Sequence, residues 1–308
     1  MTFPAYLGLY ESGELRQRVQ RAVALLAKCV LCPKTCRADR LADQLGECHV
    51  GRWARVASYS PHFGEEGPLV GRCGSGTIFF SYCNLGCIFC QNYRISQEGE
   101  GEEVSAAQLA SMMLHLQQKG CHNINLVSPS HVVPQILEAL EGAISQGLCI
   151  PLVYNTGGYD SLATLLLLDG VVDIYMPDMK YGENLVAEGL SGAASYTKVN
   201  RIVVRAMQDQ VGDLQVDEAG VARRGLIIRH LVLPNGLAGT GDVMQCLSTQ
   251  ISTLAYVNIM GQYRPCYKAH SYPYLNRPVS KEEFLEAVHM AKSNGLTRLD
   301  ESRAWALV

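Results

Sequence analysis

Runs of β-branched and aromatic residues alternate along the chain with segments whose apolar residues recur at helical spacing. From residue 77 onward each run is short and is followed by a stretch long enough for a helix. This alternation is typical of parallel strands joined by crossover helices. The pattern predicts six such strands, over residues 77–82, 123–128, 150–155, 171–176, 226–233 and 256–260.

Helix start signals and helical spacing mark the segments between these strands. Ser105 with Gln108 and Ser280 with Glu283 form capping-box patterns, in which side chains satisfy the free backbone N–H groups at a helix start. We therefore expect a helix to begin at each of the two serines. The apolar spacing also predicts helices over 15–28, 132–144, 162–168, 193–212 and 281–294, and a hairpin over 214–223.

The predicted fold is α/β, a partial and open (β/α)6 barrel with a small cysteine-rich N-terminal region. Six strand and helix units are too few to close an eight-stranded barrel, so an open one is expected. We predict three parts. Residues 1–70 form an N-terminal helix and a four-cysteine metal-binding region, residues 71–275 form the partial barrel, and residues 276–308 form a helical segment packed on the barrel.

Composition narrows the classes of protein to which the chain can belong. Of its 308 residues 48% are hydrophobic and 18% charged, which suffices for a full core, and the net charge is -3. Basic residues are not gathered in blocks, so a nucleic-acid partner is not expected. The N-terminus lacks the apolar core of a secretion signal, and the longest apolar stretch, 162–168, is far shorter than the roughly 18 residues of a membrane span. We expect a soluble, cytoplasmic protein with no membrane contact.

Twelve cysteines stand out in a chain without a secretion signal, and metal binding is their leading explanation. Cys83, Cys87 and Cys90 form a C-x3-C-x2-C loop directly after the first predicted strand, at the sheet edge where ligands bind. Three thiolates can hold three irons of a [4Fe-4S] cubane and leave the fourth iron open to a small molecule. A structural zinc site would need a fourth ligand, and no Cys or His stands nearby in the sequence.

This loop resembles the signature of the radical S-adenosylmethionine superfamily, and the whole chain resembles the iron-sulfur homologues of pyruvate formate-lyase activating enzyme. The resemblance covers nearly all of residues 29–299. Its motifs are Cys-x-x-Cys-Pro from Cys29, His62-Phe-Gly-Glu-Glu, Gly74-Ser-Gly-Thr-Ile-Phe-Phe, the cysteine loop, Asn123-Ile-Asn-Leu-Val, Tyr154-Asn-Thr, Asp173-Ile-Tyr-Met-Pro-Asp-Met-Lys180 and Arg229-His-Leu-Val-Leu-Pro.

The resemblance implies a reaction and a set of cofactor contacts. S-Adenosylmethionine would chelate the open iron and be cleaved to methionine and a 5'-deoxyadenosyl radical, which abstracts hydrogen from a substrate. Met176, Asp178 and Lys180 would support the cofactor carboxylate directly and through a monovalent cation, and Arg229 would be a further cofactor contact. Asn155 and Thr156 match the remaining cation positions, although the activating enzyme has an Asp where this chain has Asn155.

The cofactor amine has a less regular site in this chain. Ser128 and Ser130 lie where the superfamily often has a Gly-Gly-Glu-Pro-like turn, so hydroxyl or backbone groups would have to bind the amine. His131 is open to two interpretations, a cofactor contact or a histidine at a helix start without chemistry. Asn258, Gln262 and Tyr263 are expected at or beside the same mouth.

A second group of cysteines lies near the N-terminus. Cys29, Cys32, Cys36 and Cys48 supply four thiolates, which suit zinc, a rubredoxin-like iron or a second [4Fe-4S] cluster, with a structural metal slightly favoured. The remaining thiols include Cys73 and Cys266, which are expected nearer the barrel mouth.

We expect the substrate to be a protein or peptide, because the relatives that the chain resembles generate a glycyl radical on a partner polypeptide. A flavodoxin- or ferredoxin-type electron donor is expected with it. Two alternatives stay open: a radical S-adenosylmethionine enzyme acting on a small metabolite, and a non-catalytic iron-sulfur redox sensor or scaffold.

Overall fold

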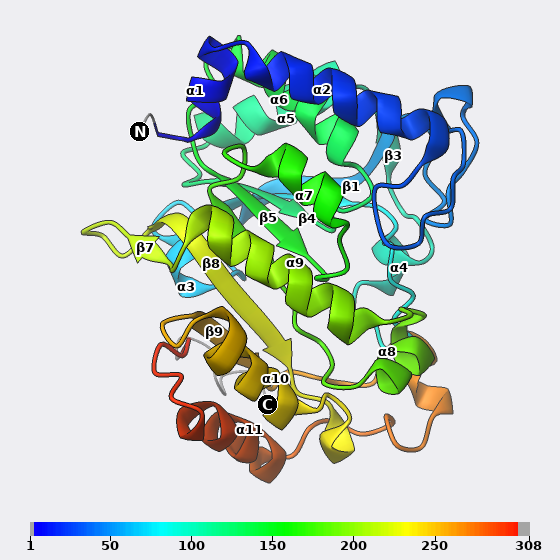
Figure 1. Cartoon of the computed structure of the whole chain (residues 1–308), viewed down its shortest axis with the longest axis vertical. Helices are drawn as coiled ribbons and strands as arrows, with labels where there is room; N and C mark the ends of the chain where they lie inside the picture. Colours follow the sequence, from blue (N-terminus) through cyan, green and yellow to red (C-terminus); the bar gives the residue numbers. More distant parts are fainter. Residues whose placement is uncertain (1–2, 301–308) are drawn as a thin grey trace.

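The computed structural model of the chain describes residues 3–300 and contains a nine-stranded sheet flanked by helices (Figure 1). The strand order is β3-β1-β2-β4-β5-β6-β8-β7, and β9 pairs with β8. The strands are β1 (Ala54–His62), β2 (Ser75–Phe80), β3 (Glu102–Val104), β4 (Ile124–Val127), β5 (Leu152–Thr156), β6 (Ile174–Pro177), β7 (Gln215–Val216), β8 (Ala222–Leu231) and β9 (Tyr256–Met260).

The longer helices cover the outer face of this sheet. The α-helices are α1 (Tyr6–Glu11), α2 (Glu14–Ala24), α3 (Gly67–Val70), α4 (Tyr93–Ser96), α5 (Ala106–Gln118), α6 (Val133–Ile144), α7 (Leu162–Leu168), α8 (Asn184–Ser191), α9 (Tyr196–Val211), α10 (Thr240–Cys246) and α11 (Lys281–Ser293). Helix α2 is continued by a short 3-10 turn, Leu25–Lys28.

The six strands predicted from the sequence are β2, β4, β5, β6, β8 and β9, and each pairs in parallel with the next. Val127 of β4 lies opposite Asn155 of β5, and Asn155 lies opposite Met176 of β6. The carboxyl ends of the strands therefore meet at one edge of the sheet. The predicted α/β fold, an open partial barrel, is confirmed.

Antiparallel strands keep the barrel open at the β2 side. β1 pairs with β2 and β3 pairs with β1, so β2 does not meet β9. The sequence pattern does not predict β1, because its residues alternate weakly and several of them are polar and exposed. Across the open side, the side-chain amide of Asn258 donates to Oε1 of Glu66 at 3.0 Å.

Both capping boxes are present. Ser105 Oγ accepts from the N–H of Gln108 at 3.3 Å, and Gln108 Oε1 accepts from the N–H of Ser105 at 2.8 Å, at the start of α5. Ser280 and Glu283 make the same reciprocal pair at α11. The predicted helices over 132–144, 162–168 and 193–212 correspond to α6, α7 and α9, and the predicted hairpin is the β7–β8 pair.

Two apolar layers lie on opposite faces of the sheet. The larger layer joins the sheet to the helices, while the smaller one fills the barrel interior. The interior group comprises Leu69, Val153, Ile174, Met176, Leu214, Ala222 and Ile227. Because side chains alternate along a strand, Asn155 and Arg229 share the inner face with Val153 and Ile227, nearer the carboxyl ends of the strands. The interior is thus apolar at its floor and polar above it.

The N-terminal helices pack on the sheet helices. Helix α2 runs along α6 (Figure 1), and the buried Tyr6 and Leu15 belong to the larger apolar layer. The division of the chain at residue 70 stays a prediction, as does the C-terminal segment, whose residues 301–308 lie outside the described residues. Within residues 3–300 no helix is both long enough and apolar enough to cross a membrane.

The capping box of α5 gives a first test. Ser105→Ala removes the hydroxyl that accepts the Gln108 N–H, so the free energy of unfolding should fall by about 1 kcal/mol. Ser111→Ala is the control, because Ser111 lies exposed within the same helix and should change stability by less than about 0.5 kcal/mol. Urea unfolding measures both, and equal effects would contradict the capping role.

Candidate functional site

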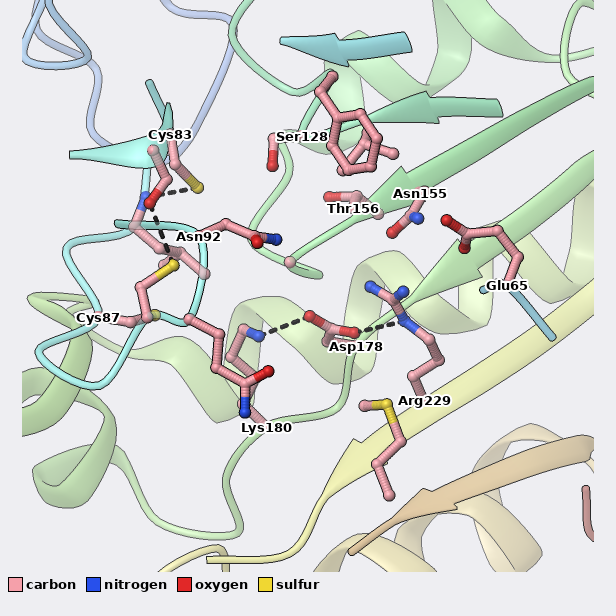
Figure 2. A pocket seen from close by; sticks show the side chains of 18 of the residues that line it. Glu65, Cys83, Cys87, Asn92, Ser128, Asn155, Thr156, Asp178, Lys180 and Arg229 are labelled. Atoms are coloured by element: carbon pink, nitrogen blue, oxygen red, sulfur yellow. Dashed lines mark hydrogen bonds and ion pairs between the residues drawn. The ribbon is translucent and has the colours of Figure 1, made fainter. Parts of the chain in front are cut away.

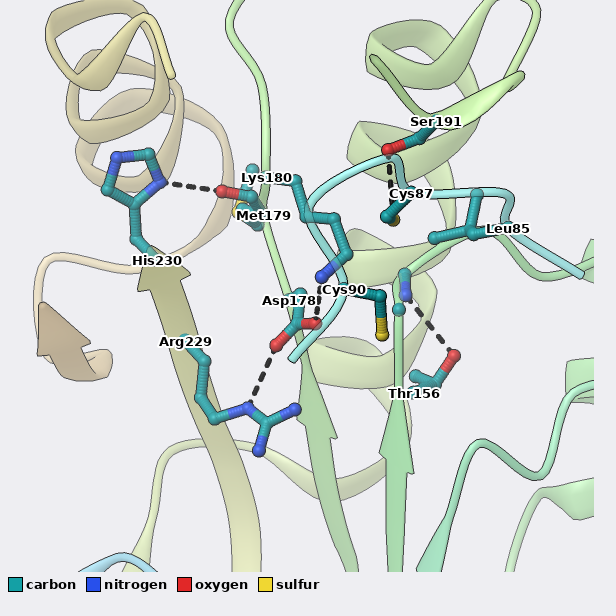
Figure 3. A network of polar contacts seen from close by, with 12 residues as sticks. Leu85, Cys87, Cys90, Thr156, Asp178, Met179, Lys180, Ser191, Arg229 and His230 are labelled. Carbon is teal, nitrogen blue, oxygen red and sulfur yellow. Dashed lines mark hydrogen bonds and ion pairs between the residues drawn. The ribbon is translucent and has the colours of Figure 1, made fainter. Parts of the chain in front are cut away.

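The cysteine loop follows β2 and is held against the end of α8. The N–H of Gly86 donates to the carbonyl of Ser191 at 2.8 Å, and the N–H of Ile88 donates to the carbonyl of Leu190 at 2.9 Å. These bonds fix the loop above the carboxyl edge of the sheet (Figure 3). Cys83, Cys87 and Cys90 all line a cavity of about 460 Å³ at that edge.

Each of the three sulfurs has a polar neighbour. Ser191 Oγ donates to Cys87 Sγ at 2.9 Å, the N–H of Leu85 lies 3.4 Å from Cys83 Sγ, and Ser96 Oγ lies 3.1 Å from Cys90 Sγ. Burial raises the pKa of Cys83 to about 12 and also raises the pKa of Cys87. A bound metal would replace those protons, and the hydrogen bonds would then stabilise the thiolates.

The donor set fits an iron-sulfur cluster. In residues 3–300 no three or more His, Cys, Asp or Glu side chains are arranged to hold a metal ion. A cubane binds each thiolate through a different iron, so its ligands stand farther apart than those of one ion. The three thiols could therefore hold a cubane and leave one iron facing the cavity.

Asp178 binds two cationic side chains beside these thiols (Figure 2). Its Oδ2 accepts from Lys180 Nζ at 2.5 Å and its Oδ1 accepts from Arg229 Nε at 2.8 Å. Burial opposes the charge on Asp178, but Arg229 and Lys180 outweigh burial and hold the pKa of Asp178 below its ordinary value. Burial likewise opposes the charges of both cations, yet Asp178 raises the pKa of Lys180 and of Arg229. All three stay ionised at neutral pH and carry a net positive charge.

Six of the eight predicted cofactor contacts line the cavity: Ser128, Asn155, Thr156, Asp178, Lys180 and Arg229. Met176 does not, because it is buried in the apolar floor of the barrel with Ile174. Ser130 does not either, because its hydroxyl is buried 2.9 Å from Thr156 Oγ1. With cationic side chains on both oxygens of Asp178, the monovalent cation stays a prediction.

Strand alternation separates the two residues of the Arg229–His230 pair. Arg229 lines the cavity, whereas His230 is buried on the other side, with one ring nitrogen 2.6 Å from the Met179 carbonyl and the other 2.9 Å from Thr240 Oγ1. His131 is fully buried, lies 3.0 Å from the Ser81 carbonyl and has its pKa lowered by burial to about 4. It does not line the main cavity, which favours the structural interpretation of His131 over a cofactor contact.

Only some of the residues expected at the barrel mouth line the cavity. Asn258 and Gln262 line the cavity, while the hydroxyl of Tyr263 is buried and donates to the Leu275 carbonyl at 2.8 Å. Cys73 is exposed and Cys266 is half-buried, and neither lines the cavity. All twelve cysteines lie within residues 3–300, and all are free thiols.

Two carboxylates that the sequence reasoning did not single out also line the cavity. Glu65 lies across the cavity from Cys83 and Cys87 (Figure 2), and Glu66 is its neighbour in the chain. Burial raises the pKa of Glu66, against the opposing charge of Arg229, and its Oε2 is buried without a hydrogen-bond partner. The His62-Phe-Gly-Glu-Glu motif carries both residues, but in the sequence it signals only a resemblance.

A second polar network supports the strand ends from below. Thr156 Oγ1 donates to Asp160 Oδ2 at 2.6 Å, and the hydroxyl of Tyr154 donates to Asp160 Oδ1 at 2.8 Å. Asp160 is buried, and nothing in the sequence pattern marks it beyond its place after β5. The network fixes the orientation of Thr156 at the cavity wall.

The four N-terminal cysteines line a second cavity of about 240 Å³. Cys29, Cys32 and Cys48 are buried, and Cys36 is half-buried. The structure therefore brings together the four thiols that the sequence spacing groups. The metal they bind stays open at this point.

No protein-family model matches the chain. The uncharacterized protein MJ0674 of Methanocaldococcus jannaschii is 32% identical over 293 residues, which cover 91% of this chain and 78% of that protein.

Three solved structures are similar to part of the chain. They are a radical SAM methyltransferase from Sphaerobacter thermophilus (14% identity, TM-score 0.47), Streptococcus suis SuiB bound to the precursor peptide SuiA (10%, 0.47) and HydG, a maturase of the [FeFe]-hydrogenase (14%, 0.48). The matches cover 71%, 69% and 71% of this chain but only 64%, 43% and 49% of the other chains. No functional conclusion follows from likenesses this weak.

The buried ion pairs of Asp178 predict a pH-dependent stability. Asp178→Asn leaves two buried cations without a counter-charge, so the free energy of unfolding at pH 7 should fall by about 3 kcal/mol. Because the folded pKa of Asp178 is depressed, its contribution is complete above the ordinary pKa of 3.8 and is lost as pH falls further. The difference between wild type and variant should therefore shrink below about pH 4.

Asp209→Asn is the matched control, because the Arg205–Asp209 pair is exposed and should contribute less than about 1 kcal/mol. Denaturant unfolding across pH measures both variants. A pH-independent difference for Asp178→Asn would contradict the ionisation assigned here.

Proposed function

The chain belongs to the same family as the protein MJ0674 of Methanocaldococcus jannaschii, and we propose that it is a radical S-adenosylmethionine enzyme. One observation carries the proposal: three thiols on one loop face the same cavity as the Asp178 ion pairs, at the carboxyl edge of an open parallel barrel. A [4Fe-4S] cluster on these thiols would supply the electron that cleaves S-adenosylmethionine to methionine and a 5'-deoxyadenosyl radical.

The charged side chains of the cavity suit the methionine part of that cofactor. Lys180 and Arg229 provide positive charge for its carboxylate, and Asp178 holds both cations in place. Ser128, Asn155 and Thr156 offer hydroxyl and amide groups at neighbouring strand ends to its amine. These side chains orient the cofactor, which is the main task left to the protein when the cofactor carries the chemistry.

Apolar side chains of the cysteine loop limit the access of water. Phe89 is buried, and its ring lies 5.9 Å from the ring of Tyr263, which closes that side of the loop. Leu85 is also buried and lines the cavity. A dry site protects a radical from side reactions.

We further propose that the substrate is a protein or peptide, as in the activating enzymes that the sequence resembles. A cavity of about 460 Å³ lies in the lower half of the range of about 300–1,000 Å³ for pockets that hold one small ligand. The cluster and S-adenosylmethionine would together occupy most of this space, so we propose that the reacting group enters from outside as part of a polypeptide. Glu65 lies across the cavity from the thiols and offers a carboxylate to an incoming peptide N–H. The electron donor proposed is a flavodoxin- or ferredoxin-type protein.

Anaerobic reconstitution with iron and sulfide tests the reaction. With S-adenosylmethionine and dithionite, the wild-type chain should form 5'-deoxyadenosine, measured by liquid chromatography. Cys87→Ala removes one ligand of the cluster and should reduce the rate at least about 100-fold, as the loss of a metal-site residue does. Cys149→Ala is the matched control, because Cys149 is exposed and should leave the rate unchanged.

No 5'-deoxyadenosine from a fully reconstituted wild-type chain would remove the enzyme proposal. A chain that binds iron and sulfide yet never cleaves the cofactor would instead support the redox sensor or scaffold.

The substrate class has a separate test. Macromolecular and small-molecule fractions of an anaerobic cell extract are added to the reconstituted chain, and 5'-deoxyadenosine release is measured with each. We expect the macromolecular fraction to stimulate release and to lose its effect after protease treatment. Stimulation by the small-molecule fraction alone would favour the small-metabolite enzyme and contradict a polypeptide substrate.

A further inference from the structure

We propose that Cys29, Cys32, Cys36 and Cys48 bind a second [4Fe-4S] cluster, and that Arg40 is its buried counter-charge. The observations are the cavity that the four thiols line, an arginine without an acidic partner at its wall, and a glycine that makes room for two of the sulfurs. The role of the second cluster rests on the function proposed above, because its cavity adjoins the main cavity and could pass an electron to it.

The size of the cavity favours a cluster over a single ion. Four thiolates around one zinc lie about 3.8 Å apart, since the Zn–S distance is about 2.3 Å in a tetrahedron, and such a site encloses no space beyond the ion. Here the four thiols line a cavity of about 240 Å³, whose wall also includes Arg40, Tyr82 and Asn84. That space exceeds what one four-coordinate ion needs and is large enough for a cubane of four irons and four sulfides.

Arg40 indicates the charge of the group that this cavity would bind. The residue is fully buried; its Nε donates to the Gly51 carbonyl at 2.9 Å and its Nη1 to the His131 carbonyl at 2.7 Å. Nη1 also lies 3.7 Å from Cys29 Sγ, while Nη2 is buried without a hydrogen-bond partner. No acidic side chain forms an ion pair with Arg40 among residues 3–300.

A buried arginine needs an anion to offset the cost of its desolvation. The imidazole of His131 at the same wall cannot provide one. Glu47 also lines the cavity, but its carboxylate pairs with Lys34, with 3.8 Å between Oε2 and Nζ. A [4Fe-4S] core with four thiolates carries a net charge of about -2. It would supply both the negative charge and the sulfur acceptors for the free Nη2 group.

The backbone around the thiols is shaped for close sulfur packing. A Cβ atom on Gly46 would lie 3.2 Å from Cys36 Sγ and 3.4 Å from Cys48 Sγ, so a side chain there would press on the first sulfur and touch the second. The N–H of Arg37 donates to the Cys29 carbonyl at 2.9 Å, and the N–H of Cys29 donates to the Ala38 carbonyl at 3.0 Å. These bonds hold the first three cysteines in one compact loop.

The second cavity lies directly behind the first. Cys83, Leu85, Ser96 and Gln97 line both cavities, so one layer of side chains separates them. A low-potential protein that donates one electron could reduce the second cluster. The electron would then lie next to the Cys83 loop. The electron lost by the donor is gained by the second cluster, and no other reactant is needed.

Metal analysis of three reconstituted proteins tests the proposal. The wild-type chain should hold about eight irons and eight sulfides. The variant with Cys32→Ala and Cys36→Ala should hold about half of each. The control variant with Cys73→Ala and Cys149→Ala loses two exposed thiols and should keep the wild-type content. Circular dichroism checks that each variant is folded.

The variant with Cys83→Ala, Cys87→Ala and Cys90→Ala separates this proposal from the proposed function. It should retain about four irons and four sulfides and lose cofactor cleavage. If the wild type fails to cleave the cofactor but this variant keeps its iron and sulfide, only the proposed function fails. About one zinc or one sulfide-free iron per chain in this variant would overturn the second cluster.

The counter-charge role has its own readout. Arg40→Gln removes a positive charge beside the second cluster, so the reduction potential of that cluster should become more negative. An EPR-monitored redox titration in the Cys83→Ala, Cys87→Ala and Cys90→Ala background measures it. Arg37→Gln is the control, because Arg37 is exposed in the same loop and should leave the potential unchanged. An unchanged potential in a folded Arg40→Gln protein would contradict the role of Arg40.

Discussion

Asp178 binds Lys180 and Arg229 at once, in a mostly buried position at the ends of β6 and β8, and the cavity depends on this interaction. Two cations and one carboxylate leave a net positive charge beside three thiols. Glu65 and Glu66 line the same cavity, and the proposed carboxylate ligand would add a further counter-charge for Lys180 and Arg229. The parallel register makes this possible, because it aligns the carboxyl ends of β5, β6 and β8.

The same constraint of buried charge connects the two cysteine-lined cavities. In the main cavity the positive charges are those of Lys180 and Arg229, which line the cavity together with the three thiols. In the second cavity Arg40 lies 3.7 Å from Cys29 Sγ and forms no ion pair with a carboxylate in the part of the chain that the structure describes. The N-terminal helices pack on α6 and hold this cysteine-rich segment behind the Cys83 loop. One chain thus presents two sulfur-rich sites separated by a single layer of side chains.

Much of the fold could be predicted from the sequence, because the apolar runs of the six parallel strands are strong local signals. Strand alternation puts only one of Arg229 and His230 inward, and the family resemblance selected Arg229, which lines the cavity. β1 was missed because its polar, partly exposed residues give no such signal. Glu66 was missed because its partner, Asn258, is 192 residues away, and sequence spacing does not reveal contacts at that separation. Met176 shares the inner face with Asp178, yet its depth in the barrel places it in the apolar floor.

The central claim is that three thiols hold a cluster whose fourth iron is free to bind S-adenosylmethionine. EPR of the dithionite-reduced chain, recorded with and without the cofactor, tests it most directly, and the Cys32→Ala and Cys36→Ala background removes the signal of the second cluster. If one iron is open, the spectrum should change when S-adenosylmethionine is added. It should not change when adenosine is added, because adenosine lacks the methionine part that binds the iron. An identical spectrum with saturating cofactor, or no cluster signal at all, would contradict the claim.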